Sequence, residues 1–101
     1  MKQQPVIGAL VRSLAGRDSG EYYLVVDSLE PPYVLVVNGL NRPLKSPKKK
    51  NLRHLQIHGT APTEVVEKIK QRIVRDEEIA RAISGMVGKD QPGGEREGNI
   101  T

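Results

Sequence analysis

Six cationic side chains lie in one short segment of the sequence, and their chemistry suits phosphate groups. They are Arg42, Lys45, Lys48, Lys49, Lys50 and Arg53. No acidic residue occurs between Pro31 and Thr63 to neutralise them. A lysine presents a point charge to a phosphate, and an arginine can bind a phosphate through two hydrogen bonds or stack on a base. The segment therefore predicts contacts with nucleic-acid phosphates, while the alternative is a solvated loop whose charge keeps the protein soluble.

Four further residues extend this candidate surface or end its turns. Arg17 lies in a glycine-bounded turn, where it is either a second phosphate contact or a residue that favours solubility. Arg12 lies in an expected strand and would join the surface if it points outward. Asn51 either reads a base edge or ends a turn, and the turn is preferred. His54 is either structural or a hydrogen-bond donor to RNA.

Other kinds of chemistry find little support in the residue types. The chain has no Cys, which excludes disulfides, thiolate zinc sites and a Cys nucleophile. His54 and His58 would lie about 13 Å apart in a strand, too far to share one metal ion. The acids Asp18, Asp27 and Glu30 are scattered over turns and strand ends. We expect no catalytic residue, metal, cofactor or small-molecule substrate.

The positive charge belongs to the first part of the chain. Residues 1–60 hold nine Lys or Arg and four Asp or Glu, a net charge of +5, whereas residues 61–101 hold seven and eight, a net charge of −1. This asymmetry indicates a polyanionic partner. The early apolar run from Val6 to Val11 contains Gly8 and is followed by Arg12, so it is too short for an export signal or a membrane span. We expect a cytoplasmic protein without membrane contact.

Five short strands must position these cations, so the predicted fold is mainly β with short α. The strands are expected at 6–15, 22–28, 33–37, 40–44 and 52–58. Asn38-Gly39 predicts a tight hairpin turn, and 45–51 is expected to be a basic loop. Tyr23 and Val25 would lie on one face of their strand and Leu24 on the other, which is typical of a strand covered on both sides.

Two other groups of residues bear on the core. Leu55 and Ile57 are candidates to point inward from the last strand. The three tyrosines, Tyr22, Tyr23 and Tyr33, are able to stack on bases, but without Phe or Trp the core is expected to need at least two of them.

The remainder of the chain changes to a helical spacing. Residues 60–86 are expected to form a helical extension of the 1–59 domain, because apolar residues recur on one face at Val66, Ile69 and Ile73. Asp76 resembles a second N-cap, so two helices that break near 74–75 are favoured over one continuous helix to Ser84. Residues 87–101 have almost nothing to bury and are expected to be a disordered tail.

The segment Gly8–Gly20 resembles a KOW motif, a strand and a glycine-anchored basic turn that lead into a second strand. Asn38-Gly39, Arg42-Pro43-Leu44 and the segment 47–55 extend the resemblance over about residues 6–57. Together they resemble the KOW barrel of the fourteen-e family of large-subunit ribosomal proteins, in its bacterial and archaeal form. The resemblance implies a five-stranded SH3-like barrel that binds structured RNA, often ribosomal, without catalysis. The chain departs from the family at Asn38, where Asp is frequent, and in its short helical tail.

The expected function is therefore non-catalytic binding of structured RNA, in particular ribosomal RNA or the ribosome, by a monomer that takes part in translation as a ribonucleoprotein component. We expect Glu at Lys48, Lys49 and Lys50 together to abolish RNA affinity without unfolding the protein. One alternative is a protein-interaction adaptor of the translation or transcription machinery that docks through an exposed helical stripe. Another is nonspecific binding of DNA or other polyanions.

Overall fold

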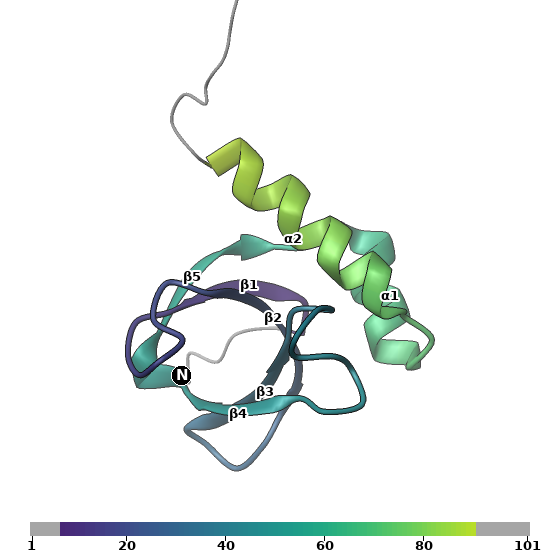
Figure 1. Cartoon of the computed structure of the whole chain (residues 1–101). Helices are drawn as coiled ribbons and strands as arrows, with labels where there is room; N and C mark the ends of the chain where they lie inside the picture. Colours follow the sequence, from purple (N-terminus) through teal and green to yellow (C-terminus); the bar gives the residue numbers. More distant parts are fainter. Residues whose placement is uncertain (1–6, 91–101) are drawn as a thin grey trace, which may run out of the picture.

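Strands and two helices make up the described part of the chain, residues 7–90 of the computed structural model (Figure 1). The mainly β class with short helices is confirmed. In chain order the elements are β1 (Ala9–Ser13), β2 (Tyr22–Ser28), β3 (Tyr33–Val37), β4 (Lys48–Asn51), the 3-10 turn η1 (Leu52–His54), β5 (Leu55–Thr60), α1 (Thr63–Gln71) and α2 (Asp76–Asp90).

The five strands form one antiparallel sheet in the order β4-β3-β2-β1-β5. Its two edge strands, β4 and β5, are consecutive in sequence and are joined only by the three residues of η1. In a flat sheet the edges would lie about 19 Å apart, at about 4.8 Å per strand. A 3-10 turn of three residues spans only about 6 Å. The sheet therefore curls, which brings the end of β4 near the start of β5, as Figure 1 shows, while β4 and β5 remain the two edge strands.

The curl creates two buried clusters, one on each face of the sheet. The inner cluster holds Val11, Tyr23, Val25, Val36 and their neighbours Ala9, Val34 and Leu55. The outer cluster joins strand residues to the helices and consists of Leu10, Leu24, Val37, Ala61, Ile69, Ile79 and Ala82. The predicted alternation in β2 is confirmed, since Tyr23 and Val25 belong to the inner cluster while Leu24 belongs to the outer cluster with the helices.

The helical extension consists of two helices, as favoured from the sequence. α1 ends at Gln71, and its C-cap residue Arg72 adopts the left-handed conformation with φ of 62° and donates its N–H to the carbonyl of Ile69. At the start of α2 the capping bond comes from Glu78, whose Oε1 accepts from Arg75 N–H at 2.9 Å. The expected N-cap, Asp76, instead accepts from Leu44 N–H at 2.8 Å.

The end of α2 differs from the expectation. The helix continues to Asp90, so residues 87–90 belong to it and not to a disordered tail. The remainder of the expected tail, residues 91–101, lies outside the described residues.

The segment after β3 also differs from the expectation. Residues 40–44 form no strand, because Asn38 closes a compact loop in place of a two-residue turn. Its Oδ1 accepts from the N–H groups of Leu40 and Arg42 at 2.8 and 2.9 Å, and its own N–H donates to the Arg42 carbonyl. Pairing with β3 resumes at Lys48, which lies opposite Val36. The predicted basic loop is therefore a strand from Lys48 onward.

The packing of the sheet depends on Gly39 and on the last strand, β5. Gly39 has φ of +78°, and a Cβ at this position would lie 2.3 Å from the carbonyl oxygen of Asp76, so the close approach of α2 requires glycine. Leu55 is buried as predicted, and Ile57 lies opposite Val11 on the same face as Leu55, but Ile57 is 57% exposed. The reason is that β5 is an edge strand, paired on one side only.

Candidate nucleic-acid interface

Strand alternation divides the lysine run into two inward residues and one outward residue. Successive side chains of a strand point to opposite faces. Lys50 is only 9% exposed and lies inside the curl, on the same face as Lys48. Lys49 is exposed, and its Nζ lies 4.5 Å from the centroid of the Tyr33 ring. The three lysines are therefore not one equivalent set of phosphate ligands.

Both inward lysines pair with Asp18 from the first turn. Lys50 Nζ lies 2.9 Å from Asp18 Oδ1, and Lys48 Nζ lies 3.3 Å from Oδ2. Ser13 Oγ donates to Oδ1 at 2.9 Å, and the Tyr23 hydroxyl donates to Oδ2 at 2.6 Å. We call these five residues the Asp18 cluster. The expectation that the lysine run has no acidic partner is therefore wrong.

The contacts within the Asp18 cluster favour a deprotonated Asp18 carboxyl and a protonated Tyr23 phenol. Burial raises the pKa of the Asp18 carboxyl, but hydrogen bonds from Lys50, Tyr23, Ser13 and Lys48 outweigh burial and bring this pKa well below its ordinary value. Burial and the hydrogen bond to Asp18 raise the pKa of the Tyr23 phenol well above its ordinary value. At neutral pH the cluster thus contains an ionised carboxylate and a neutral phenol.

The Asp18 cluster closes one end of the curled sheet. Ser13 belongs to β1 and Lys50 to β4, two strands that are not neighbours in the sheet, yet Lys50 Nζ lies 3.0 Å from Ser13 Oγ. The contact thus crosses the interior. Sequence reasoning missed Asp18 because it lies about 30 residues before its partners. The available signal was the Lys48-Lys49-Lys50 spacing, which places alternate lysines on one face of a strand.

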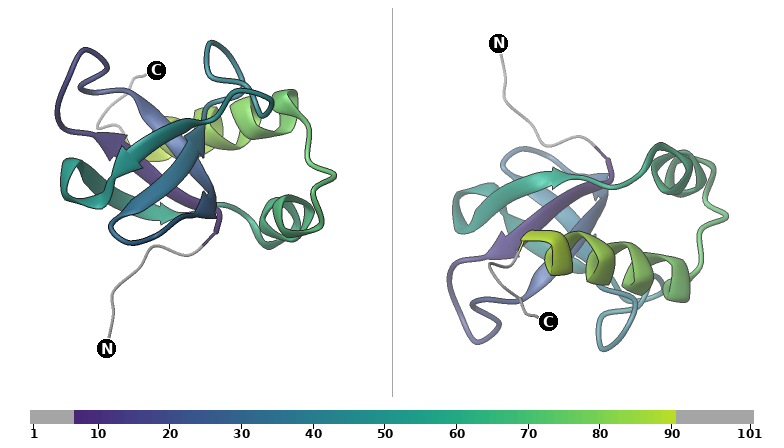
Figure 2. Two further views of the ribbon diagram at one scale, coloured as in Figure 1. Left: turned by 90° about the horizontal axis from the view of Figure 1, so that it is seen from below. Right: turned by 90° about the horizontal axis from the view of Figure 1, so that it is seen from above.

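Two loops project from this same end of the molecule (Figure 2). One is the turn 14–20, drawn in purple, and the other is the loop 38–47, drawn in teal. Arg17 lies exposed on the first, and Lys45 lies exposed on the second. Arg42 is half-buried. Its positive charge lowers the pKa of the Tyr23 phenol, although burial and Asp18 raise this pKa by more.

The turn 14–20 has a fixed backbone and lies beside η1. Gly16 and Gly20 have φ of +86° and +95°, and Gly20 N–H donates to the Ser13 carbonyl at 2.7 Å. Leu14 N–H donates to the His54 carbonyl at 2.9 Å, which places the exposed side chains of Arg53 and His54 next to the turn. Asn51 was predicted to end a turn, but it begins one: it is the N-cap of η1, and its Oδ1 accepts from Arg53 N–H at 2.9 Å.

Arg12 completes the surface from the outer face of the sheet. Its side chain is exposed, and its guanidinium lies 3.9 Å from the position that a Cβ of Gly20 would occupy. We call the set around this end the loop-end surface, and it consists of Arg12, Arg17, Arg42, Lys45, Lys48, Arg53 and His54. Of the predicted site residues, the structure separates Lys50, which is buried, Lys49, which faces outward from β4, and Asn51, which caps η1.

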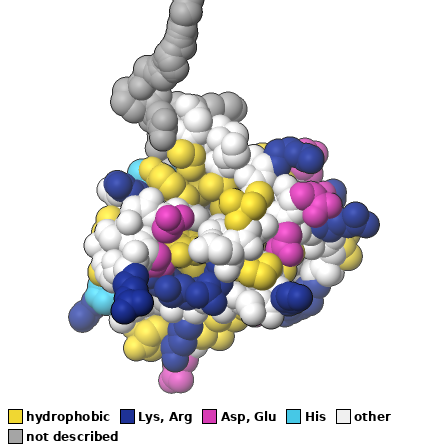
Figure 3. Space-filling view, viewed as in Figure 1, with side chains coloured by type: hydrophobic (Ala, Val, Ile, Leu, Met, Phe, Trp, Pro, Cys, Tyr) yellow, Lys and Arg dark blue, Asp and Glu magenta, His cyan; other side chains and the backbone are white. Residues whose placement is uncertain are grey.

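Charge is distributed unevenly between this surface and the helices (Figure 3). Dark blue side chains gather on the lower left of the view, next to smaller magenta areas. On the right, over α1 and α2, blue and magenta alternate. There Lys68 pairs with Glu78, and hydrogen bonds from Lys68 and from Arg75 N–H lower the pKa of the Glu78 carboxyl.

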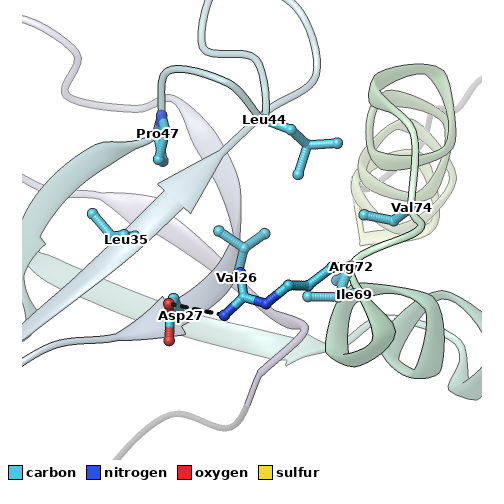
Figure 4. Close-up of a pocket in the computed structure, with 8 residues that line it drawn as sticks. All are labelled: Val26, Asp27, Leu35, Leu44, Pro47, Ile69, Arg72 and Val74. Carbon is cyan, nitrogen blue, oxygen red and sulfur yellow. Dashed lines mark ion pairs between the residues drawn. The ribbon is translucent and has the colours of Figure 1, made fainter.

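A cavity of about 240 Å³ lies away from the loop-end surface, between the sheet and the connection of the helices (Figure 4). Its wall is apolar apart from Asp27 and Arg72, whose side chains lie 3.9 Å apart across the mouth. Both charged side chains are largely exposed. The apolar lining consists of Val26, Leu35, Leu44, Pro47, Ile69 and Val74. Such a wall offers no set of converging polar groups for a reaction.

Residues 7–90 contain no group of three or more His, Asp or Glu placed to hold a metal ion. No helix within these residues is long and apolar enough to cross a membrane. Neither a protein-family model nor a curated protein matches the sequence.

Proposed function

We propose that this protein binds structured RNA, in particular ribosomal RNA or the ribosome, and catalyses no reaction. The fold proposed for it is an SH3-like barrel of the KOW type. The curled sheet whose edge strands are joined by η1, and the positive φ angles at Gly16 and Gly20, support this proposal. The proposal also takes the protein as a cytoplasmic monomer.

One observation carries the proposal: within the described residues, Arg17 and Arg53 of the loop-end surface pair neither with Asp18 nor with Glu21, the exposed acid whose charge also acts on the Tyr23 phenol. Asp18 is the acid at the centre of this surface, and a carboxylate has about four lone-pair sites. Ser13, Tyr23, Lys48 and Lys50 already occupy its oxygens. Within the described chain, Arg17 and Arg53 make no ion pair with a carboxylate. Their charge is available to phosphates.

The geometry of the loop-end surface suits contacts with RNA phosphates more than recognition of the RNA base sequence. The turn 14–20 and η1 are held by backbone hydrogen bonds, so binding costs little ordering of the protein chain. Arginine binds phosphate oxygens through two parallel hydrogen bonds. Phosphate contacts fix position and orientation, whereas selectivity would come from RNA shape.

The adaptor alternative loses its main support. It requires an exposed helical stripe at Val66, Ile69 and Ile73. Ile69 is buried, and Val66 packs so closely on Gly8 that a Cβ there would lie 2.5 Å from its Cγ2. Of these three residues, Ile73 alone is largely exposed, at 58%. A stripe that packs on the sheet is not available to a partner protein.

Charge reversal on two faces tests the proposal. The first variant combines Arg17→Glu and Arg53→Glu, and its matched control combines Lys70→Glu and Arg81→Glu on exposed helix positions. Both change the net charge by the same amount. Fluorescence anisotropy with a structured ribosomal RNA fragment should show at least about tenfold weaker binding for the first variant, and a salt slope smaller by about two. Equal losses in both variants would refute a local surface, and a competition with DNA of equal length separates RNA preference from nonspecific binding.

A further inference from the structure

A ladder of polar and aromatic side chains crosses three neighbouring strands on the outer face of the sheet. Arg12 on β1 lies opposite Tyr22 on β2 and opposite Gln56 on β5. His58 lies two residues beyond Gln56 on β5 and contacts both Gln56 and Tyr22. We call these four residues the Tyr22 patch. It meets the loop-end surface at Arg12.

The side chains of the Tyr22 patch contact one another in an ordered way. The Arg12 guanidinium carbon lies 5.9 Å from the centroid of the Tyr22 ring. The His58 ring meets the Tyr22 ring edge to face, with centroids 5.4 Å apart and an angle of 74° between planes. His58 Nε2 lies 3.1 Å from Gln56 Oε1. Tyr22 also packs on the outer cluster beneath the helices, which holds its ring in place from behind.

A shallow hollow adjoins the patch and adds apolar surface to it. Its volume is about 260 Å³, and Gly20, Tyr22, Leu40, Ile83 and Val87 are among the residues that line it. Leu40 is 74% exposed and belongs to neither the inner nor the outer cluster. Flat polar groups beside an exposed apolar floor form a surface on which a planar ring with polar edges can rest.

We infer that the Tyr22 patch binds an unpaired base of the RNA whose phosphates lie on the loop-end surface, an inference that rests on the proposed function. Aromatic rings and the guanidinium plane of arginine both stack on exposed bases. The Gln56 amide and the Arg12 N–H groups supply donors and an acceptor for base edges. Because Arg12 lies beside Gly20, a chain that contacts Arg17 can present a neighbouring base to the patch. The patch thus adds base recognition to a surface that otherwise contacts phosphates.

Two RNAs and two variants test this inference. The probes are a blunt RNA duplex and the same duplex with a single bulged nucleotide, each measured by fluorescence anisotropy. The full-length protein should bind the bulged duplex about tenfold more tightly, because stacking of one base is worth that much or more. Gln56→Ala, which lies outside the loop-end surface, should reduce this preference and leave affinity for the blunt duplex unchanged. Arg12→Lys keeps the charge but loses the planar guanidinium, so it should also reduce the preference.

The possible outcomes distinguish failure of the base site from failure of the proposed RNA binding. If Arg12→Lys keeps the preference, and Gln56→Ala does too, the patch does not bind the base. If the unmodified protein binds both duplexes equally, the base site is refuted while the proposed function stands. If it binds neither duplex nor structured ribosomal RNA, the proposed function itself fails. Arg12 and Gln56 are both exposed, so loss of the fold is not expected to obscure these results.

Discussion

Lys50 and Asp18 form the contact on which the end of the sheet depends. Their side chains are only 10% and 13% exposed. Removal of one partner from a buried ion pair leaves an uncompensated charge, which costs about 3 kcal/mol or more. We predict that Asp18→Asn lowers the free energy of unfolding by about that amount in urea denaturation. Asp27→Asn breaks an exposed pair with Arg72 and should change it by less than about 1 kcal/mol. Equal stability of the two variants would show that the Asp18 cluster has no structural role.

The same residues predict how stability depends on pH. The folded-state pKa of Asp18 lies below its ordinary value, so its contribution is present above pH of about 4 and declines as pH falls further. The folded-state pKa of Tyr23 lies above its ordinary value, so its contribution is complete below pH of about 10 and declines as pH rises above that. Urea midpoints measured across pH should therefore fall at both extremes. In Asp18→Asn the decline on the acid side should become shallower, and an unchanged acid profile would contradict this assignment.

The three lysines are expected to respond differently to charge reversal. Lys50→Glu would place a second carboxylate beside Asp18 inside the sheet, so we predict loss of folding by circular dichroism. Lys49→Glu changes an exposed residue over Tyr33 and should leave the folded structure intact. The combined replacement of all three lysines is therefore not a clean test of RNA binding, in contrast to the expectation from sequence. Folded Lys50→Glu protein with native stability would contradict the buried geometry.

At the scale of elements, the docking of the loop 38–47 on α2 depends on Gly39. This residue has a left-handed φ, and an added Cβ would overlap the Asp76 carbonyl and crowd Ala80. A left-handed conformation at a non-glycine residue costs about 1–3 kcal/mol before any clash. We predict that Gly39→Ala lowers the free energy of unfolding by at least that amount. Gly85→Ala, in the middle of α2 with nothing within 4 Å, should raise it by about 0.5–1 kcal/mol. Destabilisation by both variants alike would refute the specific role of Gly39.

Local patterns were sufficient to predict some elements and insufficient for others. The alternation of Tyr23 and Val25 with Leu24, and the glycines that bound the first turn, are short-range signals, and β1, β2 and the intervening turn follow from them. Residues 40–50 differ from the prediction because Asn38 closes a local loop and because the segment also depends on contacts distant in sequence. Asp76 accepts from Leu44 32 residues away, and Asp18 accepts from Lys50 32 residues away. No local pattern contains these contacts.

At the scale of the whole molecule, composition indicated which residues carry charge but not where each side chain points. The strand pairing of β4 determines that Lys50 faces the interior and Lys49 the solvent. The curl of the sheet brings the turn 14–20 and η1 together, and with them Arg17 and Arg53, which are far apart in sequence. The candidate surface is therefore a product of the topology. Its residues are those that the fold leaves exposed at one end.

The most direct test of the central claim is sedimentation of a cell lysate on a sucrose gradient, with and without ribonuclease. The unmodified chain should migrate with large ribosomal subunits, leave them after ribonuclease treatment, and dissociate at high salt because phosphate contacts are screened. The Arg17→Glu, Arg53→Glu variant should stay in the light fractions, while the Lys70→Glu, Arg81→Glu control should migrate as the unmodified chain does. Migration of the unmodified chain in light fractions, whether or not ribonuclease is present, would contradict the account.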